Sequence, residues 1–149
     1  MRRLSLILAA VVLAACAKKE ASAPAETPDA PAPINLATTA GTWSFKVMPA
    51  DKDTVVTTFI LVTTSTTAGW TMYLPGRDPI TMQVMVMGDS IMADAPAYES
   101  VLRKGVKVST NSIFHLVDGK LIGTAMAHYT VKGADSLVAL RLEGVKAPD

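Results

Sequence analysis

The side chains that most often carry chemistry are few in this 149-residue chain, which has one cysteine, two histidines and 13 acidic residues. The histidines, His115 and His128, stand on either side of Asp118-Gly119, a pair typical of a two-residue hairpin turn. Such a turn places Ile122 opposite His115 and both histidines on one face, about 20 Å apart at about 3.3 Å per residue. One ion cannot bind both side chains at that separation. We therefore expect two surface histidines and no metal site.

Catalytic motifs are also missing from the sequence. Gly88-Asp89-Ser90-Ile91 resembles the nucleophile block of the GDSL hydrolases, which pair that serine with a later Asp-x-x-His. Neither histidine here follows an aspartate by three residues, and Gly88-Asp89 is typical of a turn between strands. No G-x-S-x-G, H-E-x-x-H or phosphate-binding glycine loop occurs. We expect no enzymatic activity, no catalytic residue and no cofactor.

The N-terminus has the pattern of an export signal. Arg2 and Arg3 precede an apolar run over residues 4–15, which spans about 18 Å as a helix at about 1.5 Å per residue. This is short of the about 30 Å hydrocarbon core of a bilayer. The order of basic, apolar and small residues predicts a signal peptide over residues 1–15.

The single cysteine follows this run directly. Leu13-Ala14-Ala15-Cys16 resembles the lipobox of bacterial lipoproteins. The resemblance implies cleavage before Cys16 and attachment of a diacylglyceryl group to its sulfur, with acyl chains such as palmitate anchoring the protein in the membrane. In that family an aspartate after the cysteine retains the protein in the inner membrane, and Ala17 stands there instead. The resemblance therefore implies an outer-membrane lipoprotein of the cell envelope, facing the periplasm.

The charge of the whole chain excludes one class of partner, and the composition after Cys16 predicts a tether. The formal net charge is +1, and no run of Lys or Arg alternates with aromatic residues, so a nucleic-acid partner is not expected. Residues 17–33 contain four of the nine prolines and no large apolar residue before position 34. Such a segment cannot bury enough apolar surface to offset its ordering entropy. We expect residues 16–40, including the lipidated cysteine, to form a flexible Ala/Pro-rich tether.

From Gly41 onward the apolar residues alternate with polar ones, which predicts β-strands separated by turns. Helix-like periodicity is absent. The sequence predicts an all-β domain over residues 41–147, a meander of about eight short antiparallel strands that closes into a small barrel or folds into a sandwich. The expected strands are 43–47, 54–64, 70–74, 80–86, 90–95, 107–117, 120–131 and 137–145.

The hairpin at Asp118-Gly119 also predicts which residues face each other. One face of the pair places Phe114 against Gly123, and its middle positions are small; these are Thr110, Ser112, Ala125 and Ala127. Because this face is apolar at its ends, we take it as the interior. The small middle leaves room for a ligand, or it is filled by Met82 and Leu140 from other strands.

The first expected strand opens with Gly41-Thr42-Trp43, which resembles the G-x-W motif of the calycins, the group of the lipocalins and fatty-acid-binding proteins. The resemblance implies a small antiparallel barrel whose tryptophan closes one end. It also implies that an arginine of the last strand, here Arg141, packs across that tryptophan. The C-terminal helix and helical lid of that group have no counterpart in the sequence.

Two functions are compatible with these features. In the first, the barrel binds a small lipophilic ligand, and the candidate binding residues are Trp43, Trp70, Met82, Phe114 and Tyr129. In the second, the core is solid and the domain acts through its surface as a non-catalytic interaction or inhibitor subunit of the envelope. The polar segments Arg77-Asp78 and Tyr98-Glu99-Ser100, expected to be exposed, favour the second.

Overall fold

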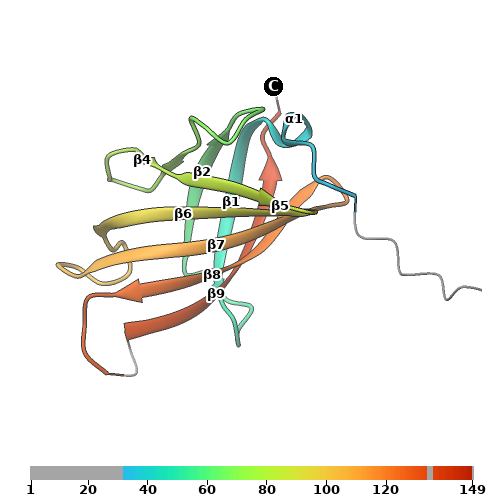
Figure 1. Cartoon of the computed structure of the whole chain (residues 1–149). Helices are drawn as coiled ribbons and strands as arrows, with labels where there is room; N and C mark the ends of the chain where they lie inside the picture. Colours follow the sequence, from blue (N-terminus) through green and yellow to red (C-terminus); the bar gives the residue numbers. More distant parts are fainter. Residues whose placement is uncertain (1–31, 134–135, 149) are drawn as a thin grey trace, which may run out of the picture.

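The computed structural model describes residues 32–133 and 136–148; the predicted signal peptide, Cys16 and most of the predicted tether lie outside this range. A single antiparallel sheet of nine strands curls into a nearly closed barrel (Figure 1). This confirms the all-β antiparallel fold and selects the barrel over the sandwich, with nine strands where about eight are predicted. The elements are α1 (Leu36–Thr39), β1 (Gly41–Pro49), β2 (Thr57–Thr63), β3 (Thr71–Tyr73), β4 (Ile80–Thr81), β5 (Gln83–Met87), β6 (Ser90–Glu99), β7 (Lys107–Val117), β8 (Lys120–Tyr129) and β9 (Leu137–Lys146). Among the described residues, α1 is far shorter than a helix that could cross a membrane.

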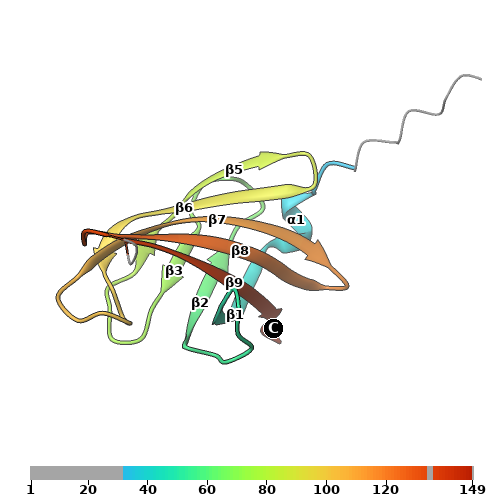
Figure 2. The same cartoon turned by 90° about the horizontal axis from the view of Figure 1, so that it is seen from below.

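The strand order is β4-β3-β2-β1-β9-β8-β7-β6-β5, so the sheet is a meander in which β1 also pairs with β9. Seen from below, β5 to β9 form a curved wall over β1 to β3 (Figure 2). The barrel is open only between β4 and β5, which the sequence predicts as one strand over 80–86. The chain divides at Met82, whose N–H donates to the carbonyl of Trp70 (2.9 Å) while its side chain enters the core.

The predicted pairing of β7 with β8 is confirmed over the whole hairpin, from Val117 opposite Lys120 to Val108 opposite Tyr129. Asp118 (φ 49°) and Gly119 (φ 75°) both have positive φ, as a type I′ turn requires. The expected inner face of β7 is buried, and Asn111 and Ile113 on its other face are exposed.

Packed structure begins at Ile34, ahead of the expected domain start at Gly41. The N–H of Ile34 donates to the carbonyl of Gly88 (2.9 Å), and its side chain packs against the core. Thr39, at the end of α1, is fully buried. Its carbonyl accepts hydrogen bonds from the Trp43 indole (2.7 Å) and from the Thr63 hydroxyl. The last residues of the predicted tether therefore cover one end of the barrel.

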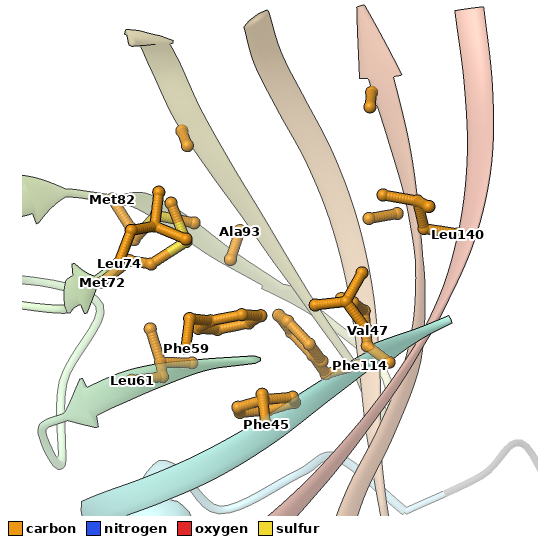
Figure 3. Packing of buried hydrophobic residues seen from close by; sticks show 14 of the residues in the cluster. Phe45, Val47, Phe59, Leu61, Met72, Leu74, Met82, Ala93, Phe114 and Leu140 are labelled. Carbon is orange, nitrogen blue, oxygen red and sulfur yellow. The ribbon is translucent and has the colours of Figure 1, made fainter. Parts of the chain in front are cut away.

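Three phenylalanines form the centre of the core (Figure 3). The Phe45 and Phe59 rings are stacked with centroids 4.8 Å apart, and Phe114 is tilted against Phe45 at 5.2 Å. Such aromatic pairs stabilise a fold beyond the area that they bury. The expected pairing of Phe114 with Gly123 is confirmed.

The expected packing of Arg141 across Trp43 is wrong. Arg141 pairs with Met48 on β1, whereas the β9 residue opposite Trp43 is Lys146. Arg141 points outward and its guanidinium donates to the carbonyl of Lys52 (2.8 Å) and to the carboxylate of Asp53. The Lys146 Nζ atom lies 5.9 Å from the centre of the Trp43 ring. Strand alternation turns Arg141 away from the interior, so a different cation lies near the tryptophan.

Candidate functional site

The barrel contains a small, partly open apolar cavity between β7 and β8 on one side and β2 and β3 on the other. The cavity has a volume of about 50 Å³, measured as the space open to the centre of a water-sized sphere. Its lining residues are Val47, Thr57, Phe59, Leu61, Met72, Leu74, Met82, Tyr98, Ser100, Val101, Leu102, Val108, Thr110, Ser112, Phe114, Ala125, Ala127, Tyr129, Leu140 and Leu142. The cavity therefore lies over the small middle of the inner face that the hairpin register predicts.

The inner face of β7 forms one wall of the cavity. Along it the inward residues are Val108, Thr110, Ser112 and Phe114, all buried. The neighbours of the two hydroxyl residues are alanines: Thr110 pairs with Ala95 and Ala127, and Ser112 pairs with Ala93 and Ala125. Ala125 and Ala127 line the cavity, because their methyl groups do not fill the space that larger residues would occupy; Ala93 and Ala95 are buried and do not line it. The result is a slot along β7 with Phe114 at its floor.

Two tyrosines stand at the other end of this slot. Val108 pairs with Tyr98 on β6 and with Tyr129 on β8, so the tyrosines lie on either side of it. Tyr98 reaches this position because a register shift, typical of a β-bulge, follows Ala95. Arg103 lies over the ring of Tyr129, 4.1 Å from its centre.

The loop between β6 and β7 covers this end of the cavity. The Ser100 hydroxyl accepts hydrogen bonds from the N–H groups of Leu102 (3.1 Å) and Arg103 (3.0 Å). Arg77 donates to the Glu99 carboxylate and to the Ser100 carbonyl, both at 3.2 Å. Ser100 is only 2% exposed. The expectation that Tyr98-Glu99-Ser100 is an exposed polar segment is thus wrong for Tyr98 and Ser100, because the register shift turns them inward; Glu99 is exposed.

Tyr98 is the titratable group that the cavity perturbs. Burial raises the pKa of its phenol above the usual value. The hydrogen bond with Thr110 acts in the opposite direction, and the nearby Tyr129 raises the pKa further. Tyr98 is therefore a neutral hydroxyl at physiological pH.

The Ser112 hydroxyl is the polar group without a partner in the slot. Ser112 is 5% exposed, lines the cavity, and makes no hydrogen bond within the described part of the chain. Among the described residues the buried side-chain atom that lacks a hydrogen-bond partner is Arg141 Nε, so the Ser112 hydroxyl keeps access to the cavity, where a water molecule or a ligand can bond to it. The hairpin register predicts that Ser112 is inside, but a register does not indicate whether its hydroxyl has a partner.

The five candidate binding residues divide into two groups. Met82, Phe114 and Tyr129 line the cavity. Trp43 and Trp70 are buried but do not line it, because their indoles are held elsewhere. Trp43 donates to Thr39 of α1, and Trp70 donates to the carbonyl of Thr66 (2.8 Å).

The histidines lie on the outer face of the sheet, as expected. His128 is exposed, and the His115 Nδ1 atom lies 3.8 Å from the Asp89 carboxylate. Ser90 donates to the same carboxylate (3.1 Å), so Asp89 stands between Ser90 and His115. A catalytic triad needs the histidine between the serine and the aspartate. Within residues 32–133 and 136–148, His, Cys, Asp and Glu form no group that could hold a metal ion.

Comparison with protein-family models, with curated proteins and with solved structures finds no match to this chain.

Proposed function

We propose that this protein is a lipid-anchored binding module of the bacterial envelope whose barrel holds a small lipophilic ligand. The observation that supports it is the apolar cavity lined by small side chains, among them Ser112, whose hydroxyl has no partner within the described part of the chain. Ligand sites are typically concave and apolar, with a few polar groups that orient the ligand. Met82, Phe114 and Tyr129 are the predicted residues that would contact the ligand.

The size of the cavity limits the ligand. About 50 Å³ is below the roughly 150 Å³ of an engineered cavity that binds benzene, and far below the about 300–1,000 Å³ of drug-sized sites. A ring would need the walls to move, whereas a slender chain needs less. Met72 and Met82 form part of the wall opposite β7, and methionine side chains adapt their shape easily.

Native mass spectrometry of the protein purified from its own host tests ligand binding. We expect a small molecule to be released from the wild-type barrel and to be absent from Ala125→Leu, whose larger side chain enters the slot. Ala139→Leu, an exposed position on β9, is the matched control and should retain the molecule. A wild-type barrel that carries nothing, and takes up no lipophilic molecule from a host lipid extract, would contradict the proposal.

The anchor is part of the same proposal and rests on Leu13-Ala14-Ala15-Cys16. Cys16→Ser should remove the acyl chains and release the protein from the membrane fraction. Ala17→Asp, which adds the retention aspartate, should leave acylation intact and move the protein from the outer to the inner membrane. Equal membrane fractions for wild type and Cys16→Ser would contradict the lipoprotein assignment.

A surface-acting envelope subunit is the second candidate function. It is favoured by apolar side chains on the outer face of β5 to β7, where Met85 is 60% exposed and Ile113 42%. Met85 and Ile113 lie in one row across the sheet, because Met92 on β6 pairs with Met85 on β5 and with Ile113 on β7. A photo-crosslinking residue at Met85 should capture an envelope protein, whereas one at the exposed Thr58 should not. Equal or absent crosslinking at the two positions would contradict this candidate.

A further inference from the structure

We infer that the ligand is a neutral, slender amphiphile whose hydroxyl or carbonyl group bonds to Ser112 at the deep end of the slot. The inference rests on the proposed function, since it names the chemical class that the cavity would select.

The polar part of the ligand follows from the neighbours of Ser112. On the inner face, Ala93 and Ala125 lie on either side of it, and neither side chain can donate or accept a hydrogen bond. Ser112 is 5% exposed and lines the cavity, and its hydroxyl has no hydrogen-bond partner among the described residues. A ligand hydroxyl or carbonyl would satisfy this group, which a pure hydrocarbon cannot do.

The neutrality of the ligand follows from the lining of the cavity. None of the described lining residues is a lysine, arginine, histidine, aspartate or glutamate. Burying a carboxylate or an ammonium without an opposite charge is far more costly than burying a neutral hydroxyl. Two arginines lie at this end of the barrel, Arg103 over the Tyr129 ring and Arg77 bonded to the Ser100 carbonyl, and neither lines the cavity.

The orientation follows from the order of residues on β7. Ser112 is next to the Phe114 floor on the inward face, and Val108, between the two tyrosines, lies four residues away, about 13 Å along the strand. The polar end of the ligand therefore enters first. Its apolar chain then runs past Thr110 toward Tyr98 and Tyr129, in a slot whose walls at Ala125 and Ala127 admit an unbranched chain.

Three probes of equal chain length test the inference: n-pentane, n-pentanol and pentanoate. The whole mature chain, residues 16–149, is made without acylation so that no detergent is needed, and each Kd is read from the NMR shifts of the Ala125 and Ala127 methyl groups. We expect n-pentanol to bind at least tenfold more tightly than pentanoate. Ser112→Ala should weaken n-pentanol roughly three- to tenfold, the effect of losing one neutral hydrogen bond, and should leave n-pentane unchanged.

Ser109→Ala is the matched control, because Ser109 lies on the outer face of the same strand; it should change no Kd. If the probes bind but Ser112→Ala leaves the Kd of n-pentanol unchanged, as it does that of n-pentane, the inference is overturned and the proposed function stands. Pentanoate as tight as n-pentanol would overturn neutrality and indicate a charged head held outside, near Arg103. No binding of any probe would contradict both the inference and the cavity's role as a ligand site.

Discussion

The ring of Phe45 occupies the space that a side chain at position 144 would need. Gly144 lies opposite Phe45 in the β1–β9 pairing, and a Cβ atom built there would lie 2.5–2.8 Å from three atoms of the ring. The same ring stacks on Phe59 and tilts against Phe114. A glycine on the last strand thus allows the aromatic cluster on the first strand to form.

Gly144→Ala should therefore destabilise the barrel. The methyl group would displace Phe45 and disturb both ring contacts, and overpacking of this kind costs about 1–3 kcal/mol. Urea denaturation of the single variants and of Phe45→Leu/Gly144→Ala measures the coupling. We expect Gly144→Ala to cost less in the Phe45→Leu background, because a smaller side chain at position 45 can make room. Equal costs in both backgrounds would show that the two residues act independently.

The two glycine–phenylalanine pairs illustrate what the sequence can predict. Phe114 and Gly123 belong to a hairpin, and the two-residue turn at Asp118-Gly119 dictates their pairing through local chemistry. The pairing of Phe45 with Gly144 joins the first and last strands, and no turn determines that register. It depends on how the whole sheet curls, which is a property of tertiary packing.

The same distinction applies to the cavity. The hairpin register predicts that the small residues Ser112 and Ala125 are inside. The prediction ends this strand at Ala95 and leaves Tyr98 on the surface, whereas β6 continues to Glu99 and shifts register after Ala95. Pro96 is the local signal of this shift, because proline inside a strand is typical of a bulge. The division of 80–86 at Met82 was missed because this segment has apolar residues on both faces, so its alternation does not reveal a break.

The perturbed tyrosine predicts a pH dependence of stability. The Tyr98 pKa is raised in the folded state, mainly by burial, whereas a tyrosine in the unfolded chain ionises near pH 10. Below about pH 9 Tyr98 is protonated in both the folded and the unfolded state, so it adds no pH dependence to the free energy of unfolding. Above about pH 10 the unfolded state loses its proton first, so the free energy of unfolding falls as pH rises toward the folded pKa.

Tyr98→Phe removes this contribution. The stability of wild type minus that of Tyr98→Phe should be constant up to about pH 9 and should decrease above about pH 10. Chemical denaturation at a series of alkaline pH values measures it, and the difference cancels the other titrating groups that the two proteins share. A difference that stays constant through this range would show that Tyr98 is not perturbed by burial.

The outer-face histidines should contribute little to stability. His128 is exposed and His115 is half-exposed, 3.8 Å from the Asp89 carboxylate, which is too long for a strong ion pair. Replacing both with glutamine should change the free energy of unfolding by less than about 0.5 kcal/mol. A loss above about 2 kcal/mol, or stoichiometric zinc that disappears with the replacement, would contradict this prediction.

Two alanines on either side of Ser112 distinguish a ligand slot from a solid core. Ala125 lines the cavity, whereas Ala93, at the same level on β6, is fully buried and does not. Leucine at position 93 must displace packed neighbours, which costs about 1–3 kcal/mol. Leucine at position 125 extends into about 50 Å³ of free space. Filling that space offsets roughly 1 kcal/mol of the overpacking cost, at about 24 cal/mol per Å³ of cavity.

We therefore expect Ala125→Leu to be about 1 kcal/mol less destabilising than Ala93→Leu in urea denaturation, and to abolish binding of n-pentanol. Because both variants add the same side chain to the same inner face, their intrinsic strand preferences are matched. Equal destabilisation by the two would mean that the space beside Ser112 cannot accept a chain. The barrel would then have a solid core, and the apolar outer row at Met85 and Ile113 would be the surface through which this protein acts.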